Sequence, residues 1–408
     1  MTLRTIYSGA WASSLRFRDF RLFWASTFFY SVGTGMEHVA VGWLVFDITG
    51  SAFMVGVAAA ARMAPLFFLG ILSGAMADWL ERRLFLLFSA LGGVAVAAIM
   101  AMLLLSGDPP VWAVVVLVAA GGCVFAFTLT TRNAYTYDIV GSEHALNGLS
   151  LNQMAMQVGG IAGALASGAL IELVGPGWQY LGVGGSYLGS ALILLVIGRS
   201  ARTAEPQREP VLRNLVGYIR FLRENRVIMA LMCLTSITEV LGFSHMTMLP
   251  VFAKEVLHVG PAGLGYLTAV RQAGGLLGLA LLANLRDYRR KGLLMFIIAT
   301  AFGIGLMGFS LSTALVYFIV VLAAVNACAM SVDTLYKTLM QSNVPDEQRG
   351  RAMGSWVLSI GVAPVGHLGV GGLATALGAQ GALLVNGAML AGVSLVAAIG
   401  LPKIRRLE

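Results

Sequence analysis

The sequence predicts an all-α integral membrane protein in which twelve transmembrane helices form two pseudo-symmetric halves of six helices each. Three observations support this fold class. The chain is 58% apolar and only 11% charged, its apolar residues fall in runs long enough to cross a bilayer, and its two halves echo each other. Soluble domains carry charge on about 25% of their residues, so the composition excludes an ordinary soluble protein.

Twelve apolar windows of roughly 20 residues with few charges mark the predicted spans. In the first half they are Leu22–Phe46, Phe53–Ala77, Leu84–Leu105, Val111–Thr131, Leu149–Leu173 and Tyr180–Gly198. In the second half they are Val227–Phe252, Gly263–Ala283, Leu293–Leu311, Ala314–Leu335, Met353–Leu377 and Ala382–Leu401. The domains are therefore predicted as an N-terminal half, residues 1–198, and a C-terminal half, residues 227–408.

The polar stretch between the halves, residues 199–226, is predicted to be a cytoplasmic linker. Glu205–Pro210 is rich in charge and proline, and apolar residues then recur at helical spacing from Leu212 to Leu222 with arginines opposite. We expect this second part to form a short amphipathic helix on the membrane surface.

The basic residues indicate the orientation. They gather before the first span and in alternate loops, where Arg132 is one of them, whereas the opposite loops contain almost none. By the positive-inside rule both termini are cytoplasmic. The net charge of +8 is thus a topology signal, and we do not expect nucleic-acid binding.

Internal repetition supports the two halves. Val140–Glu143 before the fifth span is echoed by Val344–Glu347 before the eleventh. Glycine pairs such as Gly274 and Gly278 have the small-xxx-small spacing that brings membrane helices into close contact. We interpret such pairs mainly as packing seams between helices.

One segment carries a family resemblance. Gly70–Arg83 closes an apolar run with Asp78, Arg82 and Arg83, and it resembles the loop between helices two and three of the major facilitator superfamily. The resemblance implies a cytoplasmic gate in which Gly74 allows close helix packing and the three charged residues form ion pairs that break and re-form during transport.

Three further segments, Phe17–Arg21, Val41–Phe46 and Val344–Met353, resemble the branch of this superfamily that contains bacterial enterobactin-type siderophore exporters and drug-efflux proteins. The resemblance implies efflux across the bacterial cytoplasmic (inner) membrane. In two places the chain departs from the family pattern. Gly160 stands where the antiporter motif has proline, and Val111–Thr131 lacks the arginine of the drug-antiporter motif in helix four.

Ionisable side chains at membrane depth are functional candidates, because each costs at least ~2.5 to 3.5 kcal/mol to insert. Glu37 and Arg62 both lie about 14 Å from the outer ends of adjacent antiparallel helices, so they can face each other. They form either a static ion pair or a proton-coupling pair. Glu239 is the next proton-coupling candidate, because it lies nearest the midplane of its span.

Other residues are candidates for the substrate cavity or have a local explanation. Asp333 and Lys337 are four residues apart, so an ion pair along one helix explains both. The predicted cavity residues are Arg271, His245, Asn152, Gln157, Asn326 and Trp356. The buried arginines favour an anionic substrate, since two fixed positive charges in one cavity repel a cation.

The function that these features predict is proton-coupled export of an amphipathic, siderophore-like or drug-like anion by alternating access. The alternative is a proton-coupled importer of an organic anion or nutrient, and a receptor that does not transport is a third possibility. Because no nucleophile with its base, metal cluster or cofactor loop is recognised, we do not expect an enzyme, a metal or a cofactor. The expected partners are a small-molecule substrate, protons and the lipid bilayer, and we expect a monomer.

Overall fold

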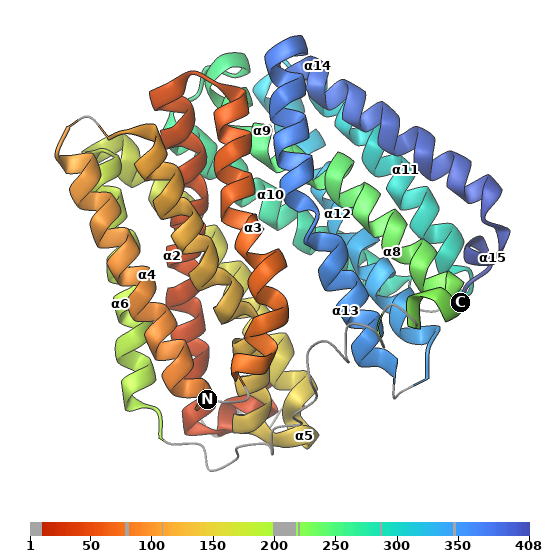
Figure 1. Ribbon diagram of the computed structural model, residues 1–408, viewed down its shortest axis with the longest axis horizontal. Helices are drawn as coiled ribbons and strands as arrows, with labels where there is room; N and C mark the ends of the chain where they lie inside the picture. Colours follow the sequence, from red (N-terminus) through yellow and green to blue (C-terminus); the bar gives the residue numbers. More distant parts are fainter. Residues whose placement is uncertain are drawn as a thin grey trace. The chain divides into compact units, whose positions relative to one another are not determined.

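The computed structural model describes residues 10–77, 81–107, 109–198, 218, 221–285, 288–345 and 348–408, and every regular element in those ranges is helical (Figure 1). The first elements are η1 (Ala10–Arg16), α2 (Arg18–Thr49), α3 (Ala52–Ala77), α4 (Arg82–Leu105), α5 (Val111–Val174) and α6 (Pro176–Val196). They are followed by α8 (Arg226–Thr238), η2 (Glu239–Phe243), α9 (His245–Val251), η3 (Phe252–Val256) and α10 (Pro261–Asn284). The last are α11 (Lys291–Ser310), α12 (Leu315–Ser342), α13 (Arg349–Ile360), α14 (Ala363–Gly400) and α15 (Pro402–Arg405).

The predicted spans all fall on these helices. Two long helices each bend at a glycine with a positive φ, at Gly141 in α5 and Gly378 in α14, both with φ 73°. Each glycine separates two of the predicted spans. Within the described ranges, nine helical stretches are long and apolar enough to cross a membrane. The predicted all-α membrane class is confirmed, and the count of twelve stays a prediction.

The predicted end of the fourth span is wrong. The sequence places Arg132 in a basic loop after Thr131, but the helix continues without a break to Gly141. The apolar window ends at the first charge, whereas the helix does not, because Arg132 has buried partners on other helices.

The chain divides into two compact units. Unit 1 contains residues 1–44, 68–206 and 260–269, and unit 2 contains residues 45–67, 207–259 and 270–408. The predicted boundaries of the repeated halves, at residues 198 and 227, stay a prediction. Most of the predicted amphipathic helix, Leu212 to Leu222, lies outside the described residues.

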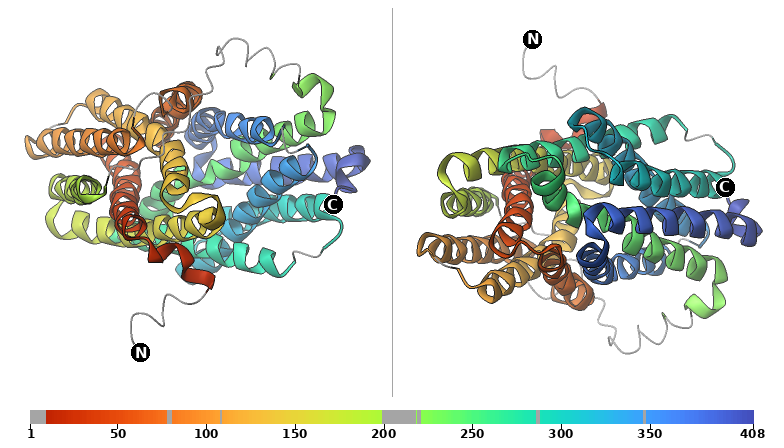
Figure 2. Two further views of the ribbon diagram at one scale, coloured as in Figure 1. Left: turned by 90° about the horizontal axis from the view of Figure 1, so that it is seen from below. Right: turned by 90° about the horizontal axis from the view of Figure 1, so that it is seen from above.

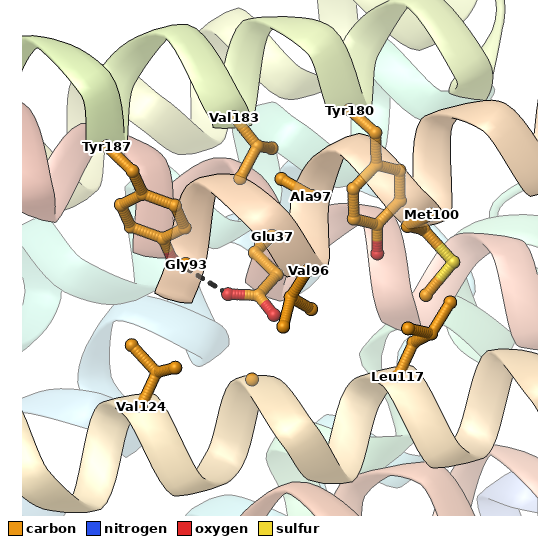
Figure 3. A pocket seen from close by; sticks show the side chains of 11 residues that line it. Glu37, Gly93, Val96, Ala97, Met100, Leu117, Val124, Tyr180, Val183 and Tyr187 are labelled. Atoms are coloured by element: carbon orange, nitrogen blue, oxygen red, sulfur yellow. Dashed lines mark hydrogen bonds between the residues drawn. The ribbon is translucent and has the colours of Figure 1, made fainter. Parts of the chain in front are cut away.

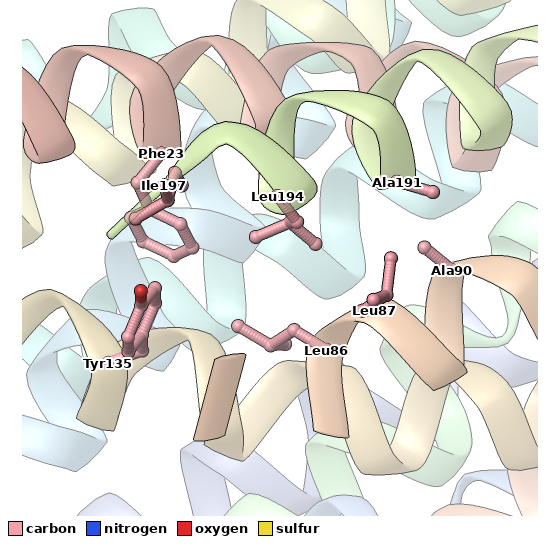
Figure 4. Packing of buried hydrophobic residues seen from close by; sticks show 8 residues of the cluster. All are labelled: Phe23, Leu86, Leu87, Ala90, Tyr135, Ala191, Leu194 and Ile197. Atoms are coloured by element: carbon pink, nitrogen blue, oxygen red, sulfur yellow. The ribbon is translucent and has the colours of Figure 1, made fainter. Parts of the chain in front are cut away.

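In unit 1, a cluster of apolar side chains holds four helices together (Figure 4). It joins Phe23 of α2, Leu86 and Leu87 of α4, Tyr135 of α5 and Leu194 of α6. The Phe23 and Tyr135 rings meet edge to face, with 5.1 Å between their centroids. Helices α4 and α6 run side by side along this cluster (Figure 1).

In unit 2, small residues allow close helix contact. A Cβ atom at Gly274 or Gly278 of α10 would lie 2.5 or 2.3 Å from a carbonyl oxygen of α12, so only glycine fits there. The predicted packing seam is thus confirmed for this pair. Helices α11 and α14 also lie side by side (Figure 2).

Helix α8 is continued by unusual turns. η2 and η3 are π-helical segments on either side of α9. Such turns insert an extra residue into the helical register and are frequent at functional sites. Glu239 is the first residue of η2.

Candidate functional site

Glu37 of α2 points into a narrow cavity inside unit 1 (Figure 3). Its side chain is buried, at 6% exposure, and the Tyr187 hydroxyl of α6 donates a 2.8 Å hydrogen bond to Glu37 Oε2. The rest of the cavity is lined by apolar residues of α4, α5 and α6 and by Tyr180. The cavity has room for about one water molecule beside the carboxylate.

Gly121 of α5 makes this position possible. A Cβ atom on Gly121 would lie 2.6 Å from Glu37 Oε1, which is too close for any larger residue unless the carboxylate moves. The buried carboxylate thus accepts a hydroxyl hydrogen bond and has space for a water beside it. The proton-coupling role of Glu37 stays a prediction.

The predicted partner of Glu37 lies in the other unit. Arg62 of α3 is also buried, at 6% exposure. Since Glu37 belongs to unit 1 and Arg62 to unit 2, their pairing stays a prediction.

Arg132 of α5 is a buried charged residue that the sequence alone places in a loop. It is 2% exposed, and its Nη1 and Nη2 atoms donate to the hydroxyls of Thr27 and Ser190 at 2.8 and 3.2 Å. The guanidinium carbon lies 4.4 Å from the centre of the Tyr30 ring and 5.6 Å from that of Phe23. These contacts tie α2, α5 and α6 together.

A local signal for Arg132 was present in the sequence. Tyr135 and Ile139 follow it at intervals of three and seven residues, which continues an apolar helical face beyond the charge. Its partners, in contrast, lie 105 and 58 residues away, so no local pattern connects them.

The gating role predicted for Gly74, Asp78, Arg82 and Arg83 stays a prediction, but the contacts of the two arginines are described. Arg82 of α4 forms a 2.7 Å ion pair with Asp138 of α5, and Arg83 donates to the carbonyl oxygen of Ile197 at 2.6 Å. Asp78 lies outside the described residues. Gly74 lies near the end of α3. The two arginines thus fix the start of α4 to α5 and to the end of α6.

A second group of candidates meets in unit 2, where His245 is fully buried. Its Nδ1 atom donates to the Gly242 carbonyl oxygen at 2.7 Å, so in the neutral ring Nε2 carries the lone pair. Asn326 Nδ2 of α12 approaches that Nε2 atom at 3.5 Å. The rings of Phe302 and Phe309 meet the imidazole edge to face.

Arg271 of α10 lies close enough to His245 for an electrostatic interaction between them. Its side chain is half-buried, and among the described residues it has no hydrogen bond or ion pair. Its Nε atom is buried without a partner in that part of the chain. A guanidinium in such surroundings can receive a carboxylate or a similar planar anion through two parallel hydrogen bonds. Arg271, His245 and Asn326 therefore form a candidate anion site.

Trp356 belongs to a different cluster of unit 2. Its indole Nε1 donates to Asp333 Oδ1 at 2.7 Å, and Asp333 Oδ2 forms a 2.8 Å ion pair with Lys337. The predicted pair along α12 is thus confirmed. Glu239 interacts electrostatically with both charged residues of this pair.

The remaining cavity candidates lie on α5. Asn152 is 1% exposed, and neither polar atom of its amide finds a partner among the residues that the structure describes. Gln157 is half-buried, five residues further along the helix. Both belong to unit 1, so a cavity shared with Arg271 stays a prediction.

Known proteins resemble this chain along nearly its whole length. A family profile described as "Transmembrane secretion effector" matches residues 8–408. The multidrug efflux pump Tap of Mycolicibacterium fortuitum is 26% identical over 92% of this chain and 94% of its own length. The enterobactin exporter EntS of Citrobacter koseri is 24% identical over 86% and 85%, and the staphyloferrin A transporter of Staphylococcus aureus 21% over 85% and 87%.

Solved structures show the same fold. The nucleoside transporter NupG superposes with a TM-score of 0.77 at 14% identity and covers 96% of this chain and all of its own. A D-xylose–proton symporter superposes with a TM-score of 0.72 at 16% identity, covering 92% of this chain and 96% of its own.

Proposed function

Because the chain belongs to the transmembrane secretion effector family of the major facilitator superfamily, and is therefore a membrane transporter and not an enzyme, we propose that it exports an amphipathic organic anion in exchange for protons. Its relatives that are named as exporters or efflux pumps support the outward direction. As in the sequence analysis, we assign it to the bacterial inner membrane, with both termini in the cytoplasm.

The proposal that the cargo is an anion rests on one observation. Arg271 carries a half-buried positive charge without a counter-ion in the described part of unit 2, and His245, which the Asn326 amide approaches at 3.5 Å, interacts with it electrostatically. A buried charge is costly when it is unpaired, so this site gains free energy when a negative group enters. The rings of Phe302 and Phe309 pack on His245 and add an apolar side. An aromatic carboxylate or catecholate has the matching chemistry.

Proton coupling is assigned first to Glu37. In an exchanger, binding of the cargo must change the affinity for the proton, and by linkage the proton must change the affinity for the cargo. The gate that accompanies this exchange is assigned to Arg82, Arg83, Asp138 and the end of α3 with Gly74 and Asp78.

Transport into inside-out membrane vesicles tests both the direction and the charge of the cargo. When the vesicle interior is acidified, vesicles that contain the protein should accumulate radiolabelled 2,3-dihydroxybenzoate, and collapse of the pH gradient should stop the accumulation. The cation ethidium should not accumulate. Uptake of the anion only into right-side-out vesicles with acid outside would instead show an importer.

The Glu37→Gln variant tests the coupling residue. It keeps the hydrogen-bonding shape but cannot release a proton, so uptake driven by the pH gradient should be lost while binding of 2,3-dihydroxybenzoate is retained. Glu172→Gln, which changes an exposed acid of the same unit, is the matched control. If Glu37→Gln still follows an imposed pH gradient, Glu37 has no part in coupling.

A further inference from the structure

Two charged side chains and one indole meet in unit 2, in a cluster that the anion site does not use. Asp333 and Lys337 pair at 2.8 Å on α12, and the Trp356 indole donates to Asp333 at 2.7 Å. The Lys337 ammonium also lies 4.0 Å from the centre of the Trp356 ring. Asp333 and Lys337 are only partly exposed, at 14% and 33%, so solvent screens their charges incompletely.

Glu239 is placed beside this group by its neighbours in the chain. The hydroxyls of Thr238 and Tyr336 are 2.9 Å apart, and these residues directly precede Glu239 and Lys337. That buried hydrogen bond holds the two chain segments together. Glu239 interacts electrostatically with Asp333 and Lys337, but no hydrogen bond or ion pair of its own carboxyl group is found in the described part of the chain.

The charges of the cluster do not balance when Glu239 is ionised, because two carboxylates then share one ammonium. In the described part of unit 2, the elements that pack on η2 place no further cation at the cluster: the only cation of α8 is Arg226, at its first position, and α13 carries exposed Arg349 and Arg351 at its start. Helix α14 brings His367, which bonds the Thr247 hydroxyl at 2.7 Å, and α9 brings His245, which bonds Gly242. The only charged residue of α11 is Lys291, at its first position. The cluster can therefore reach neutrality by taking up one proton.

We propose that Glu239, Asp333 and Lys337 form a second proton site, in which the Lys337 ammonium pairs with one carboxylate or the other. The surroundings of the Trp356 indole change with this exchange of partners. With a proton on Glu239, Lys337 pairs with Asp333, as in the structure. Loss of that proton to water leaves a second carboxylate that draws Lys337 away from Asp333 and from the Trp356 ring. The π-helical turn at Glu239 is the element whose conformation this exchange changes.

This inference deepens the proposed function, because a second proton site matters only in a proton-coupled transporter. The site nevertheless acts without cargo, so it can be tested apart from transport. The probe is pH alone, and the readout is tryptophan fluorescence of the purified full chain. Subtracting the signal of Trp356→Phe isolates the contribution of Trp356.

The isolated Trp356 signal should show one pH transition in the unmodified protein. Glu239→Gln should abolish it, whereas Glu255→Gln, which changes an exposed acid of η3, should leave it unchanged. Lys337→Met should move the midpoint to higher pH, because a positive charge that opposes protonation is removed. Asp333→Asn should move it to lower pH, because one carboxylate is removed and Lys337 becomes available to Glu239.

Lys337→Arg keeps the charge and should keep a transition, which separates loss of the switch from loss of the fold. A transition that persists unchanged in Glu239→Gln would overturn the proposal, as would the absence of any Trp356 signal that depends on pH. If the transition behaves as expected but no anion is exported, the proton site stands and the proposed cargo or direction fails.

Discussion

Two arginines inside the helical units, Arg132 in unit 1 and Arg271 in unit 2, are held in opposite ways. Arg132 is 2% exposed and donates to two hydroxyls while its guanidinium packs against two aromatic rings. Arg271 is half-buried and has no hydrogen bond or ion pair in the part of the chain that the structure describes. The same functional group thus joins helices in one unit and lacks such partners in the described part of the other.

The difference separates structural from functional charge. Hydrogen bonds to a charged group contribute about 1.5 to 3 kcal/mol each, and a desolvated cation–π contact contributes about 2 kcal/mol. Arg132 draws on both kinds of contact inside unit 1, although its Nε atom, like that of Arg271, is buried without a hydrogen-bond partner among the described residues. Arg271 lacks such compensation, and a ligand can supply it.

The largest expected effect is on Arg132. Arg132→Met removes the donors to Thr27 and Ser190 and leaves both hydroxyls with fewer partners, so we expect the free energy of unfolding to fall by about 3 kcal/mol or more. Thermal unfolding of the purified protein, followed by fluorescence, measures this loss. Arg132→Lys should recover part of it, whereas Arg271→Met should unfold at nearly the same temperature as the unmodified protein. Equal destabilisation by Arg132→Met and Arg271→Met would remove the contrast between the two arginines.

A smaller effect is expected at Gly121. Gly121→Ala places a methyl group 2.6 Å from Glu37 Oε1, and such overpacking costs about 1 to 3 kcal/mol. The carboxylate should also shift away from the Tyr187 hydroxyl, so proton-driven transport should slow more than stability alone explains. Gly92→Ala, where an added Cβ would only make an ordinary 3.5 Å contact, is the control. If both variants behave alike, the position of Glu37 does not depend on Gly121.

The smallest expected effect on stability is at the gate. Asp138→Asn breaks the ion pair with Arg82, which is partly solvent-accessible and worth about 1 kcal/mol or less. Turnover should nevertheless fall several-fold, because a gate must break and re-form its ion pairs in every transport cycle, even when each pair contributes little to stability. Transport rate and unfolding temperature measured on the same preparation distinguish the two effects. A drop in unfolding temperature as large as that of Arg132→Met would make the pair structural.

The helices and the local pair were predictable, and the long-range contacts were not. Apolar windows identify the spans because every backbone polar group in a membrane must bond within its own helix. The pair of Asp333 and Lys337 follows from their spacing alone. The buried position of Arg132 was not predicted, because an apolar window ends at a charged residue. The hydroxyl groups that accept hydrogen bonds from this charge lie on α2 and α6.

The same limit applies to the other candidates. That Glu239 starts a π-helical turn, and that Thr238 and Tyr336 hold it beside Lys337, depends on contacts between residues 98 positions apart. The Tyr187 partner of Glu37 is 150 residues away. The sequence identifies which ionisable residues lie at membrane depth, but not which of them already have hydrogen-bond or ion-pair partners.

Binding of an anion to Arg271 tests the central claim most directly. Equilibrium binding of 2,3-dihydroxybenzoate should be compared between the unmodified protein, Arg271→Lys and Arg271→Met, with the unfolding temperature of each recorded. We predict that Arg271→Met weakens binding by about 10- to 100-fold, as expected for loss of a charge-assisted hydrogen bond, that Arg271→Lys is weakened less, and that the three unfolding temperatures agree. Equal binding of the anion by all three proteins, including no binding by any of them, would contradict the account.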